Sequence, residues 1–436
     1  MANVKIVTQQ FPLSDYIVFK TKLLNWANQF NIFCLLDNNG YDEANASFSC
    51  ILAAGSKRQV SLHPADGFNQ LQGFYDVDRT WLFGHLGYGL HDAGSPQHRK
   101  PNASGFGAGF FFEPAIILKL DNNKVTIHAE SFAVIEAVFT EIMQAADDLS
   151  HDRSFTKVPH IQHTSSKEKY LETIEKLRQH IRRGDCYEIN FCQHFFAEHS
   201  PINPLAVYIE LVKRSPNPFG AFYKLNDKYC LCASPERFLK KTGKDIISQP
   251  IKGTTSRSLS DPDLDARNRS HLSTSAKEKS ENVMIVDLVR NDLSKVCEEG
   301  SVFVQELFGV YSFPQVHQLV STIKGTLPKE IRFTDAIAAT FPMGSMTGAP
   351  KLRVMQLIDQ YEEVARGLFS GSIGYITPDE DFDFNVVIRS IFYNEENQYL
   401  SFSAGSGITF YSDAHAEYDE CMLKANAIRE LLTKQP

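Results

Sequence analysis

The chain carries one lysine in a setting that could make its amine reactive. Lys252 lies in the segment QPIKGT, shortly after Glu236 in SPERF. Pro250 and Gly253 restrict the backbone around it, so we expect the amine to project from a defined turn that follows an apolar stretch. A lysine held in this way is a nucleophile if burial or a nearby cation lowers its pKa. Read alone, the segment also fits a solvated lysine beside a turn.

Two predicted helices each offer a pair of carboxylates at a spacing of three residues. Glu278 and Glu281 open a helix that continues through the apolar run VMIVDLV, and Glu417 and Glu420 repeat the spacing near the C-terminus. Lys424 extends the second face by one turn, along an apolar stripe that can border a cleft. Two such pairs suit a hard divalent cation such as Mg²⁺. Each pair alone also fits an ordinary exposed acidic face, and Glu278 fits the acid of a capping box.

Three further segments could hold an anionic ligand. Gly405 and Gly407 follow a predicted strand in AGSG, where backbone N–H groups are accessible to a carboxylate. Arg389 ends a predicted apolar strand and suits a bidentate carboxylate clamp, although a structural ion pair is an equal alternative. The segment FPMGSMTGAPK, residues 341–351, predicts a turn that leads into a helix from 351 to 361, whose N-terminal dipole favours an anion.

The elements that must position these groups can be outlined from periodicity and turn residues. Residues 1–150 predict strands joined by long loops, and the polar stretch 151–166 is a candidate boundary, which divides the chain into parts 1–155 and 156–436. A capping box at Ser165 predicts a helix that ends near Gly184, before an alternating strand. A polar segment, 255–275, separates the lysine from the helix of Glu281.

Composition limits the class of protein. The 436 residues are 43% hydrophobic and 22% charged, which is typical of a globular protein with an ample core. A net charge of -8 argues against nucleic acid or an anionic membrane surface as a partner. We find neither a secretory leader nor an apolar run near the ~18 residues that span a bilayer. The eight cysteines are scattered, so we expect reduced thiols and a cytoplasmic protein.

Nine segments, in order over residues 167–430, resemble the chorismate-utilising enzymes, which include anthranilate, aminodeoxychorismate, isochorismate and salicylate synthases. These segments are SPERF, QPIKGT, SAKEKSENVMIVDLVRND, VHQLVSTIKG, TFPMGSMTGAPK, RGLFSGSIGY, NVVIRS, AGSGI and AEYDECMLKA. The resemblance implies an α+β fold in which two sheets pack as a sandwich around the active site, with helices outside.

The resemblance also implies roles for particular residues. It places Glu281 and Glu420 as direct Mg²⁺ ligands, with Glu278 and Glu417 holding metal-bound water. It places four residues at the carboxylates of chorismate: Arg389, Gly405, Gly407 and Lys424. It places three residues around the ring and its hydroxyl: Thr254, His317 and Ser345. Glu236 matches the acid that protonates the departing C4 hydroxyl, a task that requires a raised pKa.

Position 252 separates the members of this family. Anthranilate synthases carry alanine there, whereas lysine marks aminodeoxychorismate synthase component I, in which the amine is thought to attack C2 as the C4 hydroxyl leaves. Ammonia then adds at C4 and expels the lysine, which gives 4-amino-4-deoxychorismate, a precursor of 4-aminobenzoate and folate. We therefore expect this amination, with anthranilate synthase component I as the alternative. Because we find no glutaminase segment, we expect ammonia from a separate glutamine amidotransferase subunit.

Departures from the family pattern qualify this expectation. Glu188 stands where ammonia-using members usually have glutamine and water-using members have lysine, which argues against isochorismate synthase. We expect its carboxylate to orient ammonia or ammonium. Phe369 replaces a frequent tyrosine near the carboxylate site, so one hydrogen bond is missing there. The N-terminal third has no recognisable LLES feedback segment, so we do not expect inhibition by tryptophan.

Overall fold

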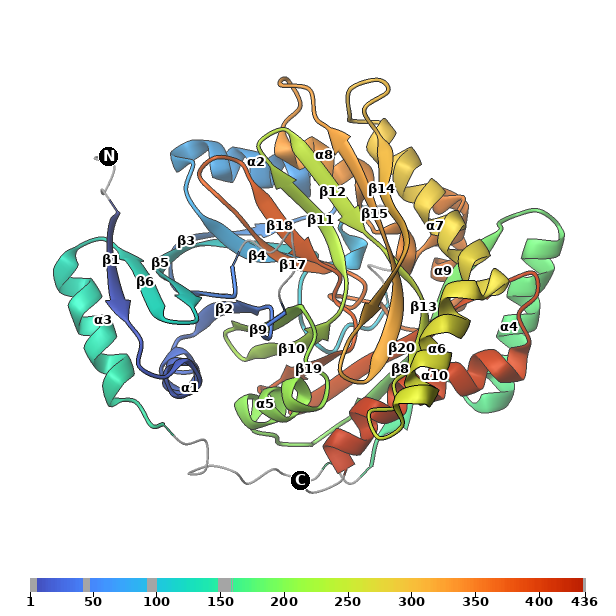
Figure 1. Ribbon diagram of the computed structural model, residues 1–436, viewed down its shortest axis with the longest axis horizontal. Helices are drawn as coiled ribbons and strands as arrows, with labels where there is room; N and C mark the ends of the chain where they lie inside the picture. Colours follow the sequence, from blue (N-terminus) through green and yellow to red (C-terminus); the bar gives the residue numbers. More distant parts are fainter. Residues whose placement is uncertain (1–5, 42–47, 92–99, 148–157, 159, 434–436) are drawn as a thin grey trace.

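The computed structural model of the protein describes residues 6–41, 48–91, 100–147, 158 and 160–433. Their strands pair antiparallel in one hydrogen-bonded network that divides at β5 (Gly109–Asp121) into two sheets. One edge of β5 pairs with β3, and the other edge pairs with β4 and then with β6 (Lys124–Ala129), which in turn pairs with β1 (Val7–Pro12). The two sheets therefore share one strand and diverge from it (Figure 1).

The first sheet, here called the glycine sheet, carries Gly405 and Gly407. Its strands, in order of pairing, are β3 (Cys50–Leu62), β2 (Ile32–Asp37), β9 (Phe219–Leu225), β10 (Lys228–Ser234), β19 (Ser390–Asn394), β20 (Tyr399–Thr409) and β8 (Glu188–Ala197). At its far edge β8 pairs with two short strands, β7 (Gln162–His163) and β16 (Gly348–Ala349).

The second sheet, here called the lysine sheet, carries Lys252. Its strands, in order of pairing, are β4 (Leu82–Leu86), β17 (Ser372–Ile376), β18 (Phe382–Asn385), β11 (Arg237–Thr242), β12 (Asp245–Gln249), β15 (Val316–Thr326) and β14 (Phe303–Ser312). β13 (Ile251–Ser256) continues from β12 along the same strand, β15.

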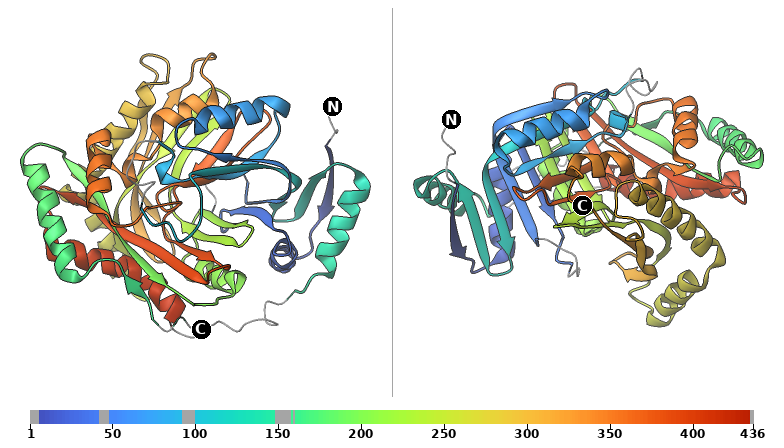
Figure 2. Two further views of the ribbon diagram at one scale, coloured as in Figure 1. Left: turned by 180° about the vertical axis from the view of Figure 1, so that it is seen from behind. Right: turned by 90° about the horizontal axis from the view of Figure 1, so that it is seen from above.

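Helices cover the outside of both sheets. They are α1 (Tyr16–Ala27), α2 (Gly67–Asp78), α3 (Phe132–Gln144), α4 (Lys167–Arg182), α5 (Pro204–Arg214), α6 (Pro262–Thr274), α7 (Ala276–Ser294), α8 (Phe333–Thr340), α9 (Lys351–Tyr361) and α10 (Ala414–Thr433). Figure 2 shows from two sides that α1 and α3 lie at one end of the molecule and α4 at the other.

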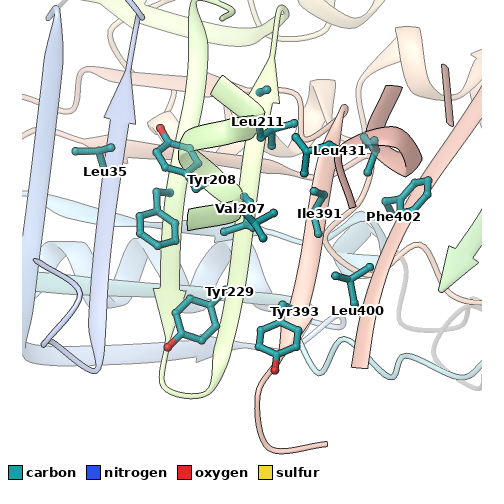
Figure 3. Close-up of a cluster of buried hydrophobic side chains, with 14 of the residues drawn as sticks. Leu35, Val207, Tyr208, Leu211, Tyr229, Ile391, Tyr393, Leu400, Phe402 and Leu431 are labelled. Carbon is teal, nitrogen blue, oxygen red and sulfur yellow. The ribbon is translucent and has the colours of Figure 1, made fainter. Parts of the chain in front are cut away.

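Two hydrophobic cores hold these layers together. One lies on the outer face of the glycine sheet, where Val207 and Leu211 of α5 and Leu431 of α10 gather over Ile391 and Phe402 (Figure 3). The other contains apolar residues of both sheets, among them Cys34 of β2 and Phe384 of β18, together with the inner faces of α7 and α8. Alternate side chains of the glycine sheet thus point into different cores, as a half-buried pleat requires. The predicted α+β sandwich with helices outside is confirmed.

The N-terminal and C-terminal parts of the chain share both sheets. β2 pairs with β9, and β4 pairs with β17, so each sheet contains strands from both parts. The division predicted at residue 155 falls outside the described residues. Within the described part of the chain, no helix is both long and apolar enough to cross a membrane.

Several local predictions are wrong. Residues 1–150 contain three helices, α1, α2 and α3, in addition to strands. The polar segment 255–275 contains α6, which buries only Leu272 and so lacks the apolar stripe that would have predicted it. The N-cap of α4 is Ser166 rather than Ser165. The predicted helix 351–361 is confirmed, and Ser275 caps α7 by accepting a hydrogen bond from the Glu278 N–H at 3.3 Å.

Candidate active site

Lys252 lies in a β-bulge, and the predicted turn is wrong. β13 pairs with β15 through Ile251 opposite Val320 and Thr254 opposite Gln318, so β13 has one extra residue between these pairs. Gly253, with φ of 101°, supplies the backbone conformation that the bulge needs. A bulge turns a side chain out of the regular alternation of a strand. Here it directs the amine of Lys252 towards the glycine sheet.

Carboxylates surround the Lys252 amine. Nζ donates to Oε1 of Glu188 at 2.5 Å and lies 3.9 Å from Oε2 of Glu281, and only 14% of the side chain is exposed. Burial alone would lower the pKa of Lys252, but Glu188, Glu281 and Glu420 outweigh it and raise the pKa above its ordinary value. The condition for a nucleophile, a lowered pKa, is therefore not met in the free protein, in which this amine is an ammonium ion.

Glu236 has the opposite environment. It connects β10 of the glycine sheet to β11 of the lysine sheet and is 4% exposed. Burial raises the pKa of the Glu236 carboxyl to about 7, although the Ser345 hydroxyl, the Ile251 N–H and the cations Lys252 and Arg389 each favour ionisation. A carboxyl in this environment keeps a proton near neutral pH, as the resemblance implies for the acid of the reaction.

Arg389 lies beside Glu236 at a second crossing between the sheets. It precedes β19 in the connection from β18, with φ of 51°, so the prediction that it ends a strand is wrong. Its guanidinium is half-buried and makes no ion pair with any described residue. The backbone links the two crossings, because the N–H of Val386 donates to the carbonyl of Glu236 at 3.0 Å. An unpaired guanidinium at this place can accept a carboxylate.

Gly405 and Gly407 lie within β20, where they were predicted to follow a strand. Gly405 is opposite Cys192 and Gly407 is opposite Asn190 of β8. A Cβ atom on Gly405 would lie 2.2 Å from the carbonyl oxygen of Phe191, so the approach of the two strands requires glycine there. A Cβ atom on Gly407 would lie 2.1 Å from Nζ of Lys252. The second glycine therefore makes room for the lysine.

The predicted metal ligands come from the two predicted helices, but they are not equivalent. Glu281 on α7 and Glu420 on α10 both act on Lys252 and Lys277. Burial, more than any other effect, raises the pKa of Glu281 to about 7. Burial would also raise the pKa of Glu420, but Lys424, whose Nζ lies 2.7 Å from Oε1, lowers it.

The two outer glutamates lie differently. Oε2 of Glu278 would be 2.9 Å from a Cβ atom on Gly253, so it lies directly against the bulge of Lys252. Glu417 is buried on the inner side of α10, where its charge acts on the Tyr170 hydroxyl. In the described ranges no three side chains of the His, Cys, Asp or Glu type are placed to hold one metal ion together.

The residues expected around the ring of the substrate lie in different surroundings. Both ring nitrogens of His317 are engaged, Nε2 with Asp265 at 3.2 Å and Nδ1 with Ser312 at 2.8 Å. Thr254 is exposed on β13. Ser345 lies in the 3-10 turn Gly344–Met346, with its buried hydroxyl facing Glu236 but without a hydrogen bond of regular geometry.

The structure reveals positioning residues that the sequence did not indicate. Arg366 donates to the carbonyl of Met346 at 2.6 Å and to that of Asn190 at 2.8 Å, and so ties the turn of Ser345 to β8. The carboxylate of Glu362 holds Arg366 in place. Their spacing of four residues was a visible signal, but the same spacing is typical of surface ion pairs.

Asn282, next to Glu281 on α7, holds the backbone of Lys252. Its Nδ2 donates to the Lys252 carbonyl at 3.4 Å, and its Oδ1 accepts from the Ser321 hydroxyl at 2.6 Å. The side chain thereby connects α7 to both β13 and β15. No spacing in the sequence signals a contact of this kind.

Comparisons with known proteins agree with this geometry. The sequence pattern of a family described as "chorismate binding enzyme" matches residues 32–430. Aminodeoxychorismate synthase component 1 of Escherichia coli (strain K12) is 39% identical over 289 residues, which cover 66% of this chain and 63% of that relative. The chain thus spans slightly less than two thirds of that relative's length.

Two longer matches are to proteins with another name. Anthranilate synthase component 1 of Saccharolobus solfataricus is 30% identical over 415 residues, covering 92% of this chain and 93% of that protein. The crystal structure of anthranilate synthase component I from Streptococcus pneumoniae TIGR4 superposes with a TM-score of 0.78 at 26% identity, covering 89% of this chain and 93% of that one. The fold, the site and the match over 32–430 place this chain in the chorismate binding enzyme family.

Proposed function

We propose that this protein converts chorismate and ammonia to 4-amino-4-deoxychorismate, the reaction of aminodeoxychorismate synthase component I. One observation carries the proposal: the amine of Lys252 reaches from the lysine sheet to Glu188 of the glycine sheet, and burial raises the pKa of the nearby Glu236 to about 7. An amine and an acid in one site are the two groups needed to form a bond at C2 while the C4 hydroxyl departs.

The donor set suits Mg²⁺. Glu281 and Glu420 would hold the ion directly, and Glu278, which lies against the same bulge, would hold metal-bound water. We keep Glu417 in the same outer role, although it faces Tyr170 in this structure. When bound, Mg²⁺ would neutralise negative charge on the substrate and help to orient it. Two direct carboxylates are enough, because this ion usually keeps several waters.

The carboxylates of chorismate would be held by cationic side chains and by the backbone. Arg389 is free of ion pairs with the described residues, and Lys424 lies beside Gly405, to whose carbonyl it donates at 3.0 Å. We keep Gly405 and Gly407 in the role that the resemblance implies, contact with a carboxylate through the backbone of β20, although the Lys252 amine fills the space at Gly407 in this structure. Thr254, His317 and Ser345 complete the wall around the ring.

The reaction would proceed as two displacements. The neutral amine of Lys252 forms a bond to C2, the ring double bond shifts, and the C4 oxygen leaves as water with the proton of Glu236. Ammonia then forms a bond to C4, the double bond shifts back, and the C2–nitrogen bond breaks to release Lys252. The new C4 ammonium returns one proton to Glu236. Two displacements place the nitrogen on C4 rather than on C2.

The nitrogen would come from a partner. We propose that a separate glutamine amidotransferase subunit supplies ammonia and that the protein acts in the cytoplasm. The name of the Escherichia coli relative, component 1, supports a further component in that protein. Copurification with an amidotransferase subunit, and activity with glutamine only when both are present, would test this part of the proposal.

A product assay separates this function from its alternative. The protein is incubated with chorismate, Mg²⁺ and ammonium, and the products are resolved by chromatography. A non-aromatic amino product, convertible to 4-aminobenzoate by a lyase, is expected. Fluorescent anthranilate together with pyruvate would instead identify anthranilate synthase, a possibility favoured by the full-length match to the Saccharolobus solfataricus protein.

A further inference from the structure

Glu188 occupies a position in the sheet that fixes its backbone on both sides. It is the first residue of β8, and it lies opposite Ala349 of β16 on one side and Thr409 of β20 on the other. Only 2% of the residue is exposed. A charged carboxylate this deeply buried requires a compensating partner, because desolvation of an ion is costly. Its surroundings therefore indicate what it does.

Among the residues that the structure describes, the carboxylate of Glu188 has a single hydrogen-bond partner. Oε1 accepts from Nζ of Lys252 at 2.5 Å, and Oε2 is buried without a hydrogen bond to any residue that the structure describes. Glu362, another buried carboxylate, is different, because it receives Arg366 on both oxygens and the backbone N–H of Cys192. A structural carboxylate is saturated in this way. Glu188 is not saturated in this way, so its free oxygen, Oε2, can accept a proton.

The chemistry proposed above requires a group of this kind. An amine forms a bond to carbon only as the neutral species, so Lys252 must lose a proton before or as it attacks. Glu281 lies 3.9 Å from Nζ, beyond hydrogen-bond distance. Among the described residues, Glu188 is the one carboxylate that accepts a hydrogen bond from this amine.

We propose that Glu188 is the proton acceptor for Lys252, an inference that rests on the proposed function. One proton of the Lys252 ammonium moves to the Glu188 carboxylate as nitrogen forms its bond to C2, which leaves a neutral carboxyl beside the new secondary ammonium. When ammonia attacks C4 and the C2–nitrogen bond breaks, the released amine takes the proton back. Lys252 and Glu188 thus end the cycle as they began, and no other reactant is needed.

Gly407 of the facing strand β20 leaves space for the proton transfer between Lys252 and Glu188. A Cβ atom on Gly407 would lie 2.1 Å from Nζ of Lys252 and 2.6 Å from Oε1 of Glu188, so the pair fills the space above that glycine. The donor and the acceptor are therefore held together from two sheets, with the bulge of β13 on one side and the start of β8 on the other. Proton transfer needs this fixed proximity.

The experiment compares Glu188→Gln with the wild-type protein. Each is mixed with chorismate and Mg²⁺ without ammonium, quenched at short times, and measured by intact mass for an adduct of chorismate minus water. Glutamine keeps the size and the acceptor oxygen but takes up no proton, so adduct formation is expected to slow by about 10²-fold. The KM for chorismate and the melting temperature are expected to change little, and Glu188→Asp should retain part of the rate.

The outcomes separate the two proposals. A glutamine variant that forms the adduct at the wild-type rate would overturn the proton-acceptor role, and so would an aspartate variant as slow as glutamine. If both variants fold poorly, the rate is compared per folded protein. A wild-type protein that makes the 4-amino product without any lysine adduct overturns the inference but keeps the proposed function. Anthranilate as the product overturns the function itself.

Discussion

Two parts of the candidate active site differ in how they stabilise a buried charge. Around Lys252, carboxylates from β8, α7 and α10 converge on a cation that spans the two sheets. At the crossings of the chain between the sheets, Glu236 is buried and Arg389 is half-buried, each with few partners, and burial raises the pKa of the acid to about 7. In the first part carboxylates balance the charge of Lys252, whereas in the second part burial disfavours the ionised form of Glu236.

The difference follows from where each part lies in the fold. Lys252 extends from the lysine sheet to β8 of the glycine sheet and lies near carboxylates from several elements, so opposite charges surround it. Glu236 sits where β10 passes into β11, surrounded by the backbone of two sheets, and there desolvation dominates its pKa. A site that needs a nucleophile and an acid at the same pH can obtain both by placing them in such different surroundings.

The largest expected effect comes from removing the amine. Lys252→Ala should abolish amination at C4 or divert the product to anthranilate, because the bond to C2 can no longer form. Product chromatography with free ammonium measures this directly. Unchanged product at an unchanged rate would contradict the covalent role and would leave Lys252 as a charge that only balances the glutamates.

Removing the acidic proton of Glu236 should lower the reaction rate nearly as much as removing the Lys252 amine. Glu236→Gln keeps the size of the side chain but has no proton to donate, so kcat is expected to fall by about 10²–10⁴-fold. The KM for chorismate should change little, because the proton matters mainly as the C4 oxygen departs. Steady-state kinetics at saturating ammonium provide the measurement. A large rise in KM with unchanged kcat would show that Glu236 binds the substrate and does not act as the acid.

A methyl group on β20 tests the contact between the sheets. Gly407→Ala would place Cβ 2.1 Å from the amine and should displace it, with a loss of about 10²-fold in kcat. Gly73→Ala in α2 is the matched control, since no atom lies within 4 Å of its Cβ position, and it should leave kcat unchanged. Equal activity of the two variants would mean that Lys252 acts from another position.

The sequence could predict the local parts of this arrangement, but not the contacts between residues that are far apart in the chain. The capping of α7 by Ser275 and the helix 351–361 are local, and both were predicted correctly. The bulge at Lys252 was missed because it depends on the register between β13 and β15, which are more than sixty residues apart in the chain. The prediction that Gly405 and Gly407 follow a strand failed similarly, because the partner strand β8 lies far upstream.

The charge state of the site was beyond sequence reasoning for a related reason. The lysine segment alone left the direction of the pKa shift open, because that direction is set by Glu188, Glu281 and Glu420, which come from three separate elements. The resemblance named Glu281 and Glu420 as metal ligands and left Glu188 unassigned. Only the folded chain shows that all three act on one amine.

The pH dependence of kcat/KM should report the protonation of Glu236. Glu236 must be protonated to act as the acid, and burial raises its pKa to about 7, so kcat/KM should fall about tenfold for each unit of pH well above that value. Lys252 and Arg389, which face it, favour ionisation. Total ammonium is adjusted to keep free ammonia constant as the pH changes. A profile that stays flat from pH 6 to pH 9 would remove Glu236 from the role of acid.

The smallest expected effect concerns Asn282, which links α7, the helix of Glu281, to β13, the strand of Lys252. Asn282→Ala removes the donor to the Lys252 carbonyl and leaves the Ser321 hydroxyl without its acceptor, at a cost of about 1 kcal/mol in stability. If Asn282 also fixes the bulge, kcat should fall several-fold more than it does in Ser321→Ala, which lowers stability through the same pair but leaves Nδ2 on the carbonyl. Thermal unfolding and kcat are measured for both variants. Equal kcat values would show that the bulge holds its shape through Gly253 and the strand register alone, so that positioning of the amine belongs entirely to the lysine sheet.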